Sequence, residues 1–290
     1  MNEDNSVKTD QNTKKKGSAE LKQRIIAGLA GLGIILGALF WHPWSYFSIF
    51  LLISLITQRE FYQLTGLRKK QDLQIYGIVL GAATNVLIFL YFYSPLPVAA
   101  VKFYTLVFPA LFAAFLLELY RKNNPTPFQD LGWWFLGIMY IAVPFALLHF
   151  VAFYVPGKYS PTNILGVLFL IWANDIGAYF TGKAFGKHSL FPRISPKKTW
   201  EGSIGGMVTT LLVAILLSFI FNGLQAWQWL GIVVIVILAG TSGDLIESMF
   251  KRSIHIKDSG STIPGHGGFL DRFDALLMAI PFIVAFLQIF

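Results

Sequence analysis

The sequence contains no cysteine and few charged residues. Without cysteine, the chain can form no disulfide bond and offers no thiolate ligand to a metal ion. Charged residues make up 13% of its 290 residues, whereas soluble proteins carry roughly 25%. Hydrophobic residues make up 55%. This composition argues against a soluble protein and favours one that is embedded in a membrane.

Long apolar runs recur along the chain, and several approach the roughly 20 residues that a helix needs to cross a bilayer. The runs are continuous, whereas a transmembrane β-barrel would show short segments of alternating polarity. We therefore predict an all-α, polytopic membrane protein. Its nine expected spans lie near residues 25–41, 44–58, 73–93, 98–120, 131–154, 162–181, 203–221, 227–247 and 269–290.

The first 23 residues are polar and rich in lysine. They lack the small-residue cleavage site of a secretory signal peptide, so we expect a disordered cytoplasmic tail rather than a removable leader. No later polar stretch is long enough for a soluble domain, and we find no convincing internal repeat. We therefore predict one membrane-embedded domain over residues 24–290.

The 23 lysine and arginine residues are unevenly divided between the expected loops. With the N-terminus placed inside, 21 of them fall on the inner side and two, Lys102 and Lys158, on the outer side. This bias predicts a cytoplasmic N-terminus and an outer C-terminus. The orientation, together with attraction to anionic lipid headgroups, accounts for the net charge of +8. Nucleic acid is therefore not an expected partner.

Five acidic residues are expected at one depth, near the inner ends of three spans. A carboxylate at that depth costs a few kcal/mol unless it is paired or binds a metal ion. Structural ion pairs are one explanation, for example between Asp271 and Lys251 or between Asp244 and Arg272. The five acidic residues are Asp175 in the sixth span, Asp244 and Glu247 in the eighth, and Asp271 and Asp274 in the ninth.

A metal and phosphate site is the second explanation for this acidic cluster. Oxygen ligands without a histidine or cysteine cluster suit Mg²⁺ or a similar ion. Basic residues beside such a metal favour phosphate groups. The accompanying basic residues are Lys197, Lys198, Lys251, Arg252, Lys257 and Arg272.

Glycines have two expected roles in this half of the chain. Gly265, Gly267 and Gly268 precede the ninth span, where their N–H groups either face an anion at the helix N-terminus or form a plain turn. Next to them, His266 either donates to a phosphate or fixes the loop. Further upstream, the pair at 205 and 206 is expected to let two helices pack closely.

The stretch from Ser248 to Asp274, SMFKRSIHIKDSGSTIPGHGGFLDRFD, resembles the signature of the phosphatidate cytidylyltransferase family, also called the CDP-diacylglycerol synthases. It follows the pattern S-x-x-K-R-x4-K-D-x5-P-x-H-G-G-x2-D-R-x-D at every specified position. The upstream blocks NDIGAYFTGKAFGK and SPKKTWEG are also similar to blocks of this family. The length and the number of expected spans agree with the family over nearly the whole chain.

The resemblance implies transfer of CMP from CTP to phosphatidic acid, which gives CDP-diacylglycerol and pyrophosphate in phospholipid biosynthesis. It implies a site that faces the cytoplasm from a cell membrane, and a possible homodimer. It also implies Mg²⁺ bound by Asp244 and Asp271, with Glu247 and Asp274 as further candidate ligands; participation of a monovalent cation such as K⁺ stays open. The candidate catalytic residues are Asp244, Asp271, Lys251, Arg252, Lys257, His266 and Arg272, and the candidate substrate-binding residues are Ser195, Lys197, Lys198, Asp175, Gly267 and Gly268.

Two other functions remain as alternatives. A cytidylyltransferase that acts on a different lipid phosphate would use the same phosphate chemistry. An ion-coupled transporter also buries carboxylates in membrane helices, but its site usually lies near the midplane at a repeat interface. The acidic residues here gather toward one face of the membrane, which favours the enzyme.

Overall fold

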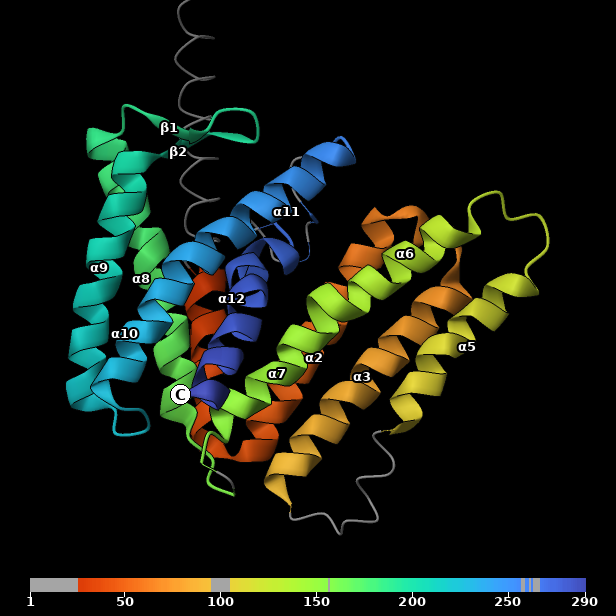
Figure 1. Cartoon of the computed structure of the whole chain (residues 1–290), viewed down its shortest axis with the longest axis horizontal. Coiled ribbons are helices and arrows are strands. Elements are labelled where there is room, and N and C mark those ends of the chain that lie inside the picture. Colours follow the sequence, from red (N-terminus) through yellow and green to blue (C-terminus); the bar gives the residue numbers. More distant parts are fainter. Residues whose placement is uncertain (1–25, 95–104, 156, 257–258, 261, 263–266) are drawn as a thin grey trace, which may run out of the picture.

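The computed structural model describes residues 26–94, 105–155, 157–256, 259–260, 262 and 267–290, and it is almost entirely helical (Figure 1). The first half contains an apolar helix at Ile26–Trp41, followed by α2 (Pro43–Leu64), the 3₁₀ turn η1 (Gly66–Lys69), α3 (Gln71–Tyr93), α5 (Val107–Leu119), α6 (Pro127–Gly137) and α7 (Val143–Ala152). The second half contains α8 (Pro161–Phe185), β1 (Ser189–Phe191), β2 (Ser195–Thr199), α9 (Trp200–Ile220), α10 (Ala226–Ile235), α11 (Thr241–Ser253) and α12 (Leu270–Ile289).

Six helical segments among the described residues are long and apolar enough to cross a membrane. This finding confirms an all-α membrane protein. The expected count of nine spans is not confirmed and stays a prediction, because Ile26–Trp41 and Val107–Leu119 are shorter and α2 ends in a polar turn. The six segments are Gln71–Tyr93, Pro127–Ala152, Pro161–Phe185, Trp200–Ile220, Ala226–Ser253 and Leu270–Ile289.

Two of the spans contain a π-helical turn. The turn η3 (Ile138–Ala142) joins α6 to α7, and η4 (Val236–Gly240) joins α10 to α11. Pro144 follows η3, and a proline has no N–H group to donate to the preceding helical turn. A π turn holds one residue more than an α-helical turn, and such turns often occur near functional sites. The second turn leads directly into the helix that carries Asp244.

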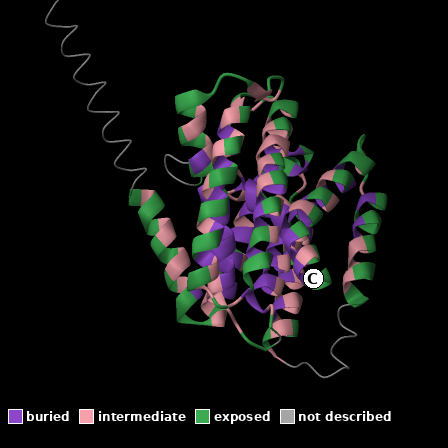
Figure 2. Ribbon diagram, turned by 60° about the vertical axis from the view of Figure 1, so that its left-hand side comes forward, coloured by how far each residue is buried: buried purple, intermediate pink, exposed green. Residues whose placement is uncertain are grey.

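The core of the bundle lies between α2, α7, α8 and α12. Side chains such as Phe50, Phe145 and Ile280 are almost completely buried there. Figure 2 shows the buried residues gathered in the middle of the molecule, with mostly exposed residues on the outer helices. On α9, by contrast, Leu212 and Phe219 are 63% and 81% exposed. In a membrane protein such apolar faces contact lipid rather than water.

Glycines bring α8 and α9 into close contact, as the sequence predicts. A Cβ atom on Gly206 would lie 2.8 Å from the carbonyl oxygen of Asn174, and one on Gly205 would collide with the side chain of Thr181. Small residues at such an interface let two backbones approach each other. This packing affects the site because α8 and α9 both line a cavity that is described below.

The expected inner loop between α8 and α9 contains a β-hairpin that the sequence did not predict. Strands β1 and β2 are antiparallel, with Ser189 opposite Thr199 and Phe191 opposite Ser195. A second difference concerns α11, which continues to Ser253 instead of ending near residue 247. The hairpin, η1 and the C-terminal end of α11 lie at the same end of the bundle (Figure 1).

Replacing Gly206 with alanine tests the close packing of α8 and α9. We expect the variant to lose about 1–3 kcal/mol of stability, because the new methyl group has to push a backbone carbonyl away. Gly132→Ala is the matched control, since its Cβ atom would meet nothing within 4 Å and alanine favours the helix. Thermal unfolding in detergent measures the stability of both variants. Equal melting temperatures for the two variants would contradict the proposed packing.

Candidate active site

The site begins where α11 packs against α12. Gly243 makes this contact possible, because a Cβ atom there would lie 2.7 Å from the carbonyl oxygen of Asp274 and 2.8 Å from Cβ of Met278. The next residue, Asp244, comes within hydrogen-bonding reach of the Asp274 side chain. Two carboxylates that face each other repel, so this position calls for a proton or a cation between them.

Lys251 joins the two helices one turn further along. Its Nζ atom lies 2.6 Å from Oε2 of Glu247 and 2.8 Å from Oδ1 of Asp271. Glu247 and Lys251 are four residues apart and therefore share one face of α11. The side chain of Glu247 is 2% exposed and that of Asp271 10%. Because an unpaired buried carboxylate is costly, this shared lysine offsets part of the cost of burying the two acids.

The loop before α12 also converges on Asp271. The backbone N–H groups of Ser259 and Gly268 each donate to its Oδ2 atom over 3.1 Å. Gly267 has a φ angle of +82°, which glycine adopts more readily than other residues. The anion that accepts a hydrogen bond from the Gly268 N–H group is therefore the Asp271 carboxylate of the same protein. A bound phosphate at this N–H group stays a prediction, and it would have to replace or share the contact with Asp271.

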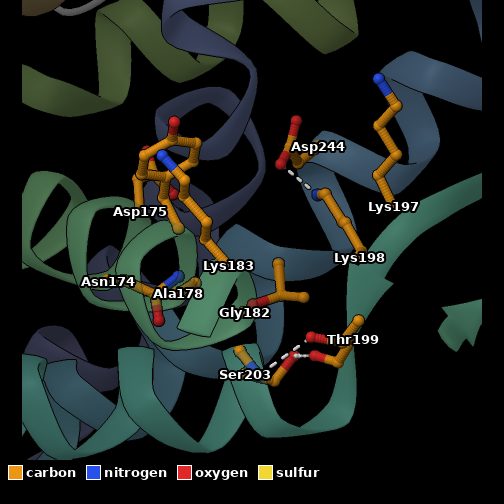
Figure 3. Close-up of a pocket in the computed structure, with 13 residues that line it drawn as sticks. Asn174, Asp175, Ala178, Gly182, Lys183, Lys197, Lys198, Thr199, Ser203 and Asp244 are labelled. Carbon is orange, nitrogen blue, oxygen red and sulfur yellow. Dashed lines mark hydrogen bonds and ion pairs between the residues drawn. The ribbon is translucent and has the colours of Figure 1, made fainter. Parts of the chain in front are cut away.

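A cavity of about 430 Å³ opens beside this pair of helices. Its walls come from α8, β2, α9 and α11, and Asp175, Lys197, Lys198 and Asp244 line it (Figure 3). Lys198 points toward Asp244, and the two form an ion pair. Asp175 is close enough to both for their charges to affect it. The structure thus brings together residues from three distant sequence segments.

Lys183 is a cavity residue that the sequence reading used only for membrane orientation. It lines the cavity together with Asp175 and Tyr179. These three residues are spaced by four along α8, so they fall on one face of the helix. The spacing from Asp175 is the signal that could have identified Lys183. From α9, Ser203 completes the wall.

Glu60 is the second residue that the sequence reading missed. It lies in the last turns of α2 and is 7% exposed. Its Oε2 atom accepts a hydrogen bond from the backbone N–H of Leu270 over 3.0 Å, and the N–H of Phe269 also donates to this carboxylate. These are N-terminal amides of α12, which α12 itself leaves unpaired. A carboxylate is favourable at that position because the helix dipole is positive there.

The remaining candidates lie at the edge of the site or beyond the described residues. Lys257 and His266 fall outside the part of the chain that the structure describes. Arg252 is exposed, and its Nη1 atom donates to the carbonyl oxygen of Ile256 over 3.3 Å. Arg272 follows Asp271 and is close enough to influence Asp175. Ser195 lies on β2 but is not among the residues that line the cavity.

The arrangement leaves some oxygen atoms available to a metal ion. Within the described ranges, no group of three acidic or histidine side chains surrounds one point. Glu247 nevertheless has an Oε1 atom that is buried and has no hydrogen-bond partner. The facing carboxylates of Asp244 and Asp274 add further oxygens nearby, so the donors on these helices are oxygen atoms, although no three of the acids meet at one point in the described part of the chain. Such a set fits a hard divalent cation such as Mg²⁺.

Substitution of Glu60 tests its contact with α12. We expect Glu60→Ala to cost about 1–3 kcal/mol of stability, because the buried amides of residues 269 and 270 lose their acceptor. Glu60→Gln keeps one acceptor oxygen and should cost less. Hydrogen exchange should quicken at the start of α12 in Glu60→Ala and not in Gln63→Ala, an exposed position on the same helix. Unchanged exchange in Glu60→Ala would show that the contact contributes nothing.

Comparison with known proteins agrees with the resemblance in the signature. A model described as "Cytidylyltransferase family" matches residues 22–290. A protein of Staphylococcus aureus (strain COL) named phosphatidate cytidylyltransferase is 40% identical over 161 residues, which cover 55% of this chain and 60% of that protein. A protein of Bacillus subtilis (strain 168) with the same name is 39% identical over 184 residues, or 62% of this chain and 68% of that protein. The match thus spans less than two thirds of the first relative. Because the family match extends over nearly the whole sequence, this chain belongs to the cytidylyltransferase family.

Proposed function

We propose that this chain transfers CMP from CTP to phosphatidic acid and releases pyrophosphate. The observation that carries the proposal is the cavity beside α11 and α12, where Lys198 pairs with Asp244 next to the Lys251–Asp271 contact. This combination of lysines and carboxylates suits a triphosphate bound with a divalent cation. The names of the two bacterial relatives support the same reaction.

The chemistry requires little from the protein beyond positioning and charge neutralisation. A phosphomonoester has a second pKa of about 6, so most of a lipid phosphate is already a dianion at neutral pH. Its oxygen attacks the α-phosphorus of CTP, the bond from that phosphorus to the bridging oxygen breaks, and pyrophosphate leaves with the electron pair. No general base is needed, which agrees with a cavity that no histidine lines among the described residues.

Repulsion between the two anionic substrates is the main obstacle to this reaction. Lys183, Lys197 and Lys198 come from two sides of the cavity and supply positive charge where a triphosphate would lie. Fixed charges of this kind stabilise the transition state because they need no reorganisation when the phosphoryl group moves. In this proposal Asp244 holds Lys198 in place until CTP arrives, and Lys251 keeps Asp271 oriented.

A divalent cation is the second part of the proposal. Asp244 and Asp271 are the proposed ligands, and Glu247 and Asp274 are further candidates whose oxygens lie close by. Bound Mg²⁺ would neutralise charge on the phosphates of CTP. The protein's part is to present these oxygens from two helices that Lys251 and Gly243 hold together.

The proposed orientation places this site at the cytoplasmic face, with nine spans and an inner N-terminus. The lipid phosphate would reach the site from the inner leaflet, where its acyl chains can remain, and CTP would enter from the cytosol. The charge bias of the sequence supports this arrangement.

A homodimer is part of the same family-based proposal. A different lipid phosphate as acceptor is the second candidate, because the same groups would serve it.

Pyrophosphate release from CTP tests the activity. We expect release by the purified protein to require both phosphatidic acid and Mg²⁺ and to stop with EDTA. Asp244→Asn and Asp271→Asn should each lower the rate at least about 100-fold, because each removes a proposed ligand of the cation that neutralises the phosphates. Asp72→Asn is the matched control, since this aspartate pairs with Arg121 outside the cavity.

Each result of this assay distinguishes between the candidate functions. Release that depends on another lipid phosphate and not on phosphatidic acid would change the acceptor. Full activity in either site variant would move the metal elsewhere. No release from CTP in folded, reconstituted protein would reject the enzyme and favour the transporter.

Single cysteines test the orientation directly, because the sequence has no cysteine of its own. We expect Lys158→Cys to react with an impermeant thiol reagent on intact cells. Lys122→Cys should react only after the membrane is permeabilised. Both positions are exposed. The opposite labelling pattern would invert the proposed topology, and labelling of both in intact cells would change the number of spans between them.

A further inference from the structure

A second cavity lies between α2, η1 and α3, and the proposed reaction does not use it. Its volume is about 690 Å³, and it shares no lining residue with the cavity beside α11. Arg59 from α2 and Arg68 from η1 supply its charge, and Gln71 and Gln74 from α3 supply further polar groups. Among the described residues, no acidic side chain lines this cavity. It therefore has the charge of an anion-binding site.

The two arginines are free to bind a ligand. The guanidinium group of neither residue forms an ion pair or a hydrogen bond with any described residue, and both residues are exposed. The nearest acids in the sequence are engaged elsewhere, since Glu60 accepts from the start of α12 and Asp72 pairs with Arg121. An arginine fork matches the geometry of a phosphate group and can donate two hydrogen bonds to it.

The apolar side of the same cavity continues down the bundle. Ile75 and Ile78 line the cavity, and they follow Gln71 by four and seven residues on the same face of α3. Beyond them Val79 is 58% exposed on α3, and Leu52 is 51% exposed on α2. This face lies within a membrane span, so acyl chains can cover it. A polar end with two arginines thus leads into an apolar surface.

We propose that this cavity binds an anionic phospholipid of the bilayer, with its phosphate between Arg59 and Arg68. The acyl chains lie along the apolar face that begins at Ile75. A free phosphate would fill only the polar end and would leave this face without a partner. The site goes beyond the proposed transfer reaction, because it uses a separate cavity and its occupancy can be measured without CTP.

The position of Arg59 links this lipid to the reaction site. Arg59 and Glu60 are consecutive residues of α2, and Glu60 contacts the start of α12. A lipid that holds Arg59 in place therefore also holds the helical turn that supports α12. The lipid would stabilise the protein by binding its folded state.

Lipid binding to the purified protein tests the proposal. Native mass spectrometry would count bound phosphatidylglycerol, with phosphatidylcholine as the neutral comparison. We expect Arg59→Gln/Arg68→Gln to bind one phosphatidylglycerol fewer, or at least about 10-fold more weakly. The control Lys69→Gln/Lys122→Gln removes the same charge from exposed residues that do not line the cavity, and it should bind like the unchanged protein.

Competition by soluble phosphates and a conservative variant distinguish a lipid site from a site for a soluble anion. Inorganic phosphate and glycerol phosphate at millimolar concentration should fail to displace the lipid; displacement would show that the site takes a soluble anion instead. Arg59→Lys keeps the positive charge but loses the fork of the guanidinium group. We expect it to bind phosphatidylglycerol more weakly than the unchanged protein and more tightly than the double variant. If the double variant does not fold, Arg59→Lys takes its place in the comparison. Equal binding by the arginine variants and the control, or equal binding of both lipids, would overturn the proposal.

Discussion

The contact of one ammonium group with two carboxylates holds the reactive half of this protein together. Lys251 lies between Glu247 and Asp271, on helices that also pack closely at Gly243 and bring Asp244 near Asp274. Each of the two acids would be costly in a membrane domain without this partner. Because the lysine contacts both, α11 can present a further carboxylate, that of Asp244, to the neighbouring cavity. The position of Asp244 depends on the same packing.

The α2 helix extends this dependence to the other half of the chain. Glu60 binds the first amides of α12, whereas Arg59 lines a separate cavity between α2, η1 and α3. Two neighbouring residues of one helix therefore serve regions that differ in charge and in exposure. A polar helix end is costly near a bilayer unless its groups have partners. Here one of the partners is a helix terminus 210 residues away.

The sequence predicted those features of the fold that depend on composition and on continuous apolar runs. The six long spans and the close packing at Gly205 agree with the structure, because apolar runs and small residues are local signals. The hairpin was missed because the β2 segment SPKKT has no strand-like alternation and depends on pairing with β1. The end of α11 was placed too early because hydropathy falls where the charges begin, although Lys251 pairs inward. Glu60 was missed since its partners lie far away in the sequence.

The π turn η4 has a consequence for how this family can change during evolution. It lies between Ile235 and Thr241, immediately before the helix that carries Asp244 and Lys251. Each residue of an α-helix rotates the next by about 100°. Loss or gain of one residue in this turn would rotate both side chains away from α12 together. The site therefore constrains the length of this turn, while packing constrains its buried residues Val236, Ala239 and Gly240.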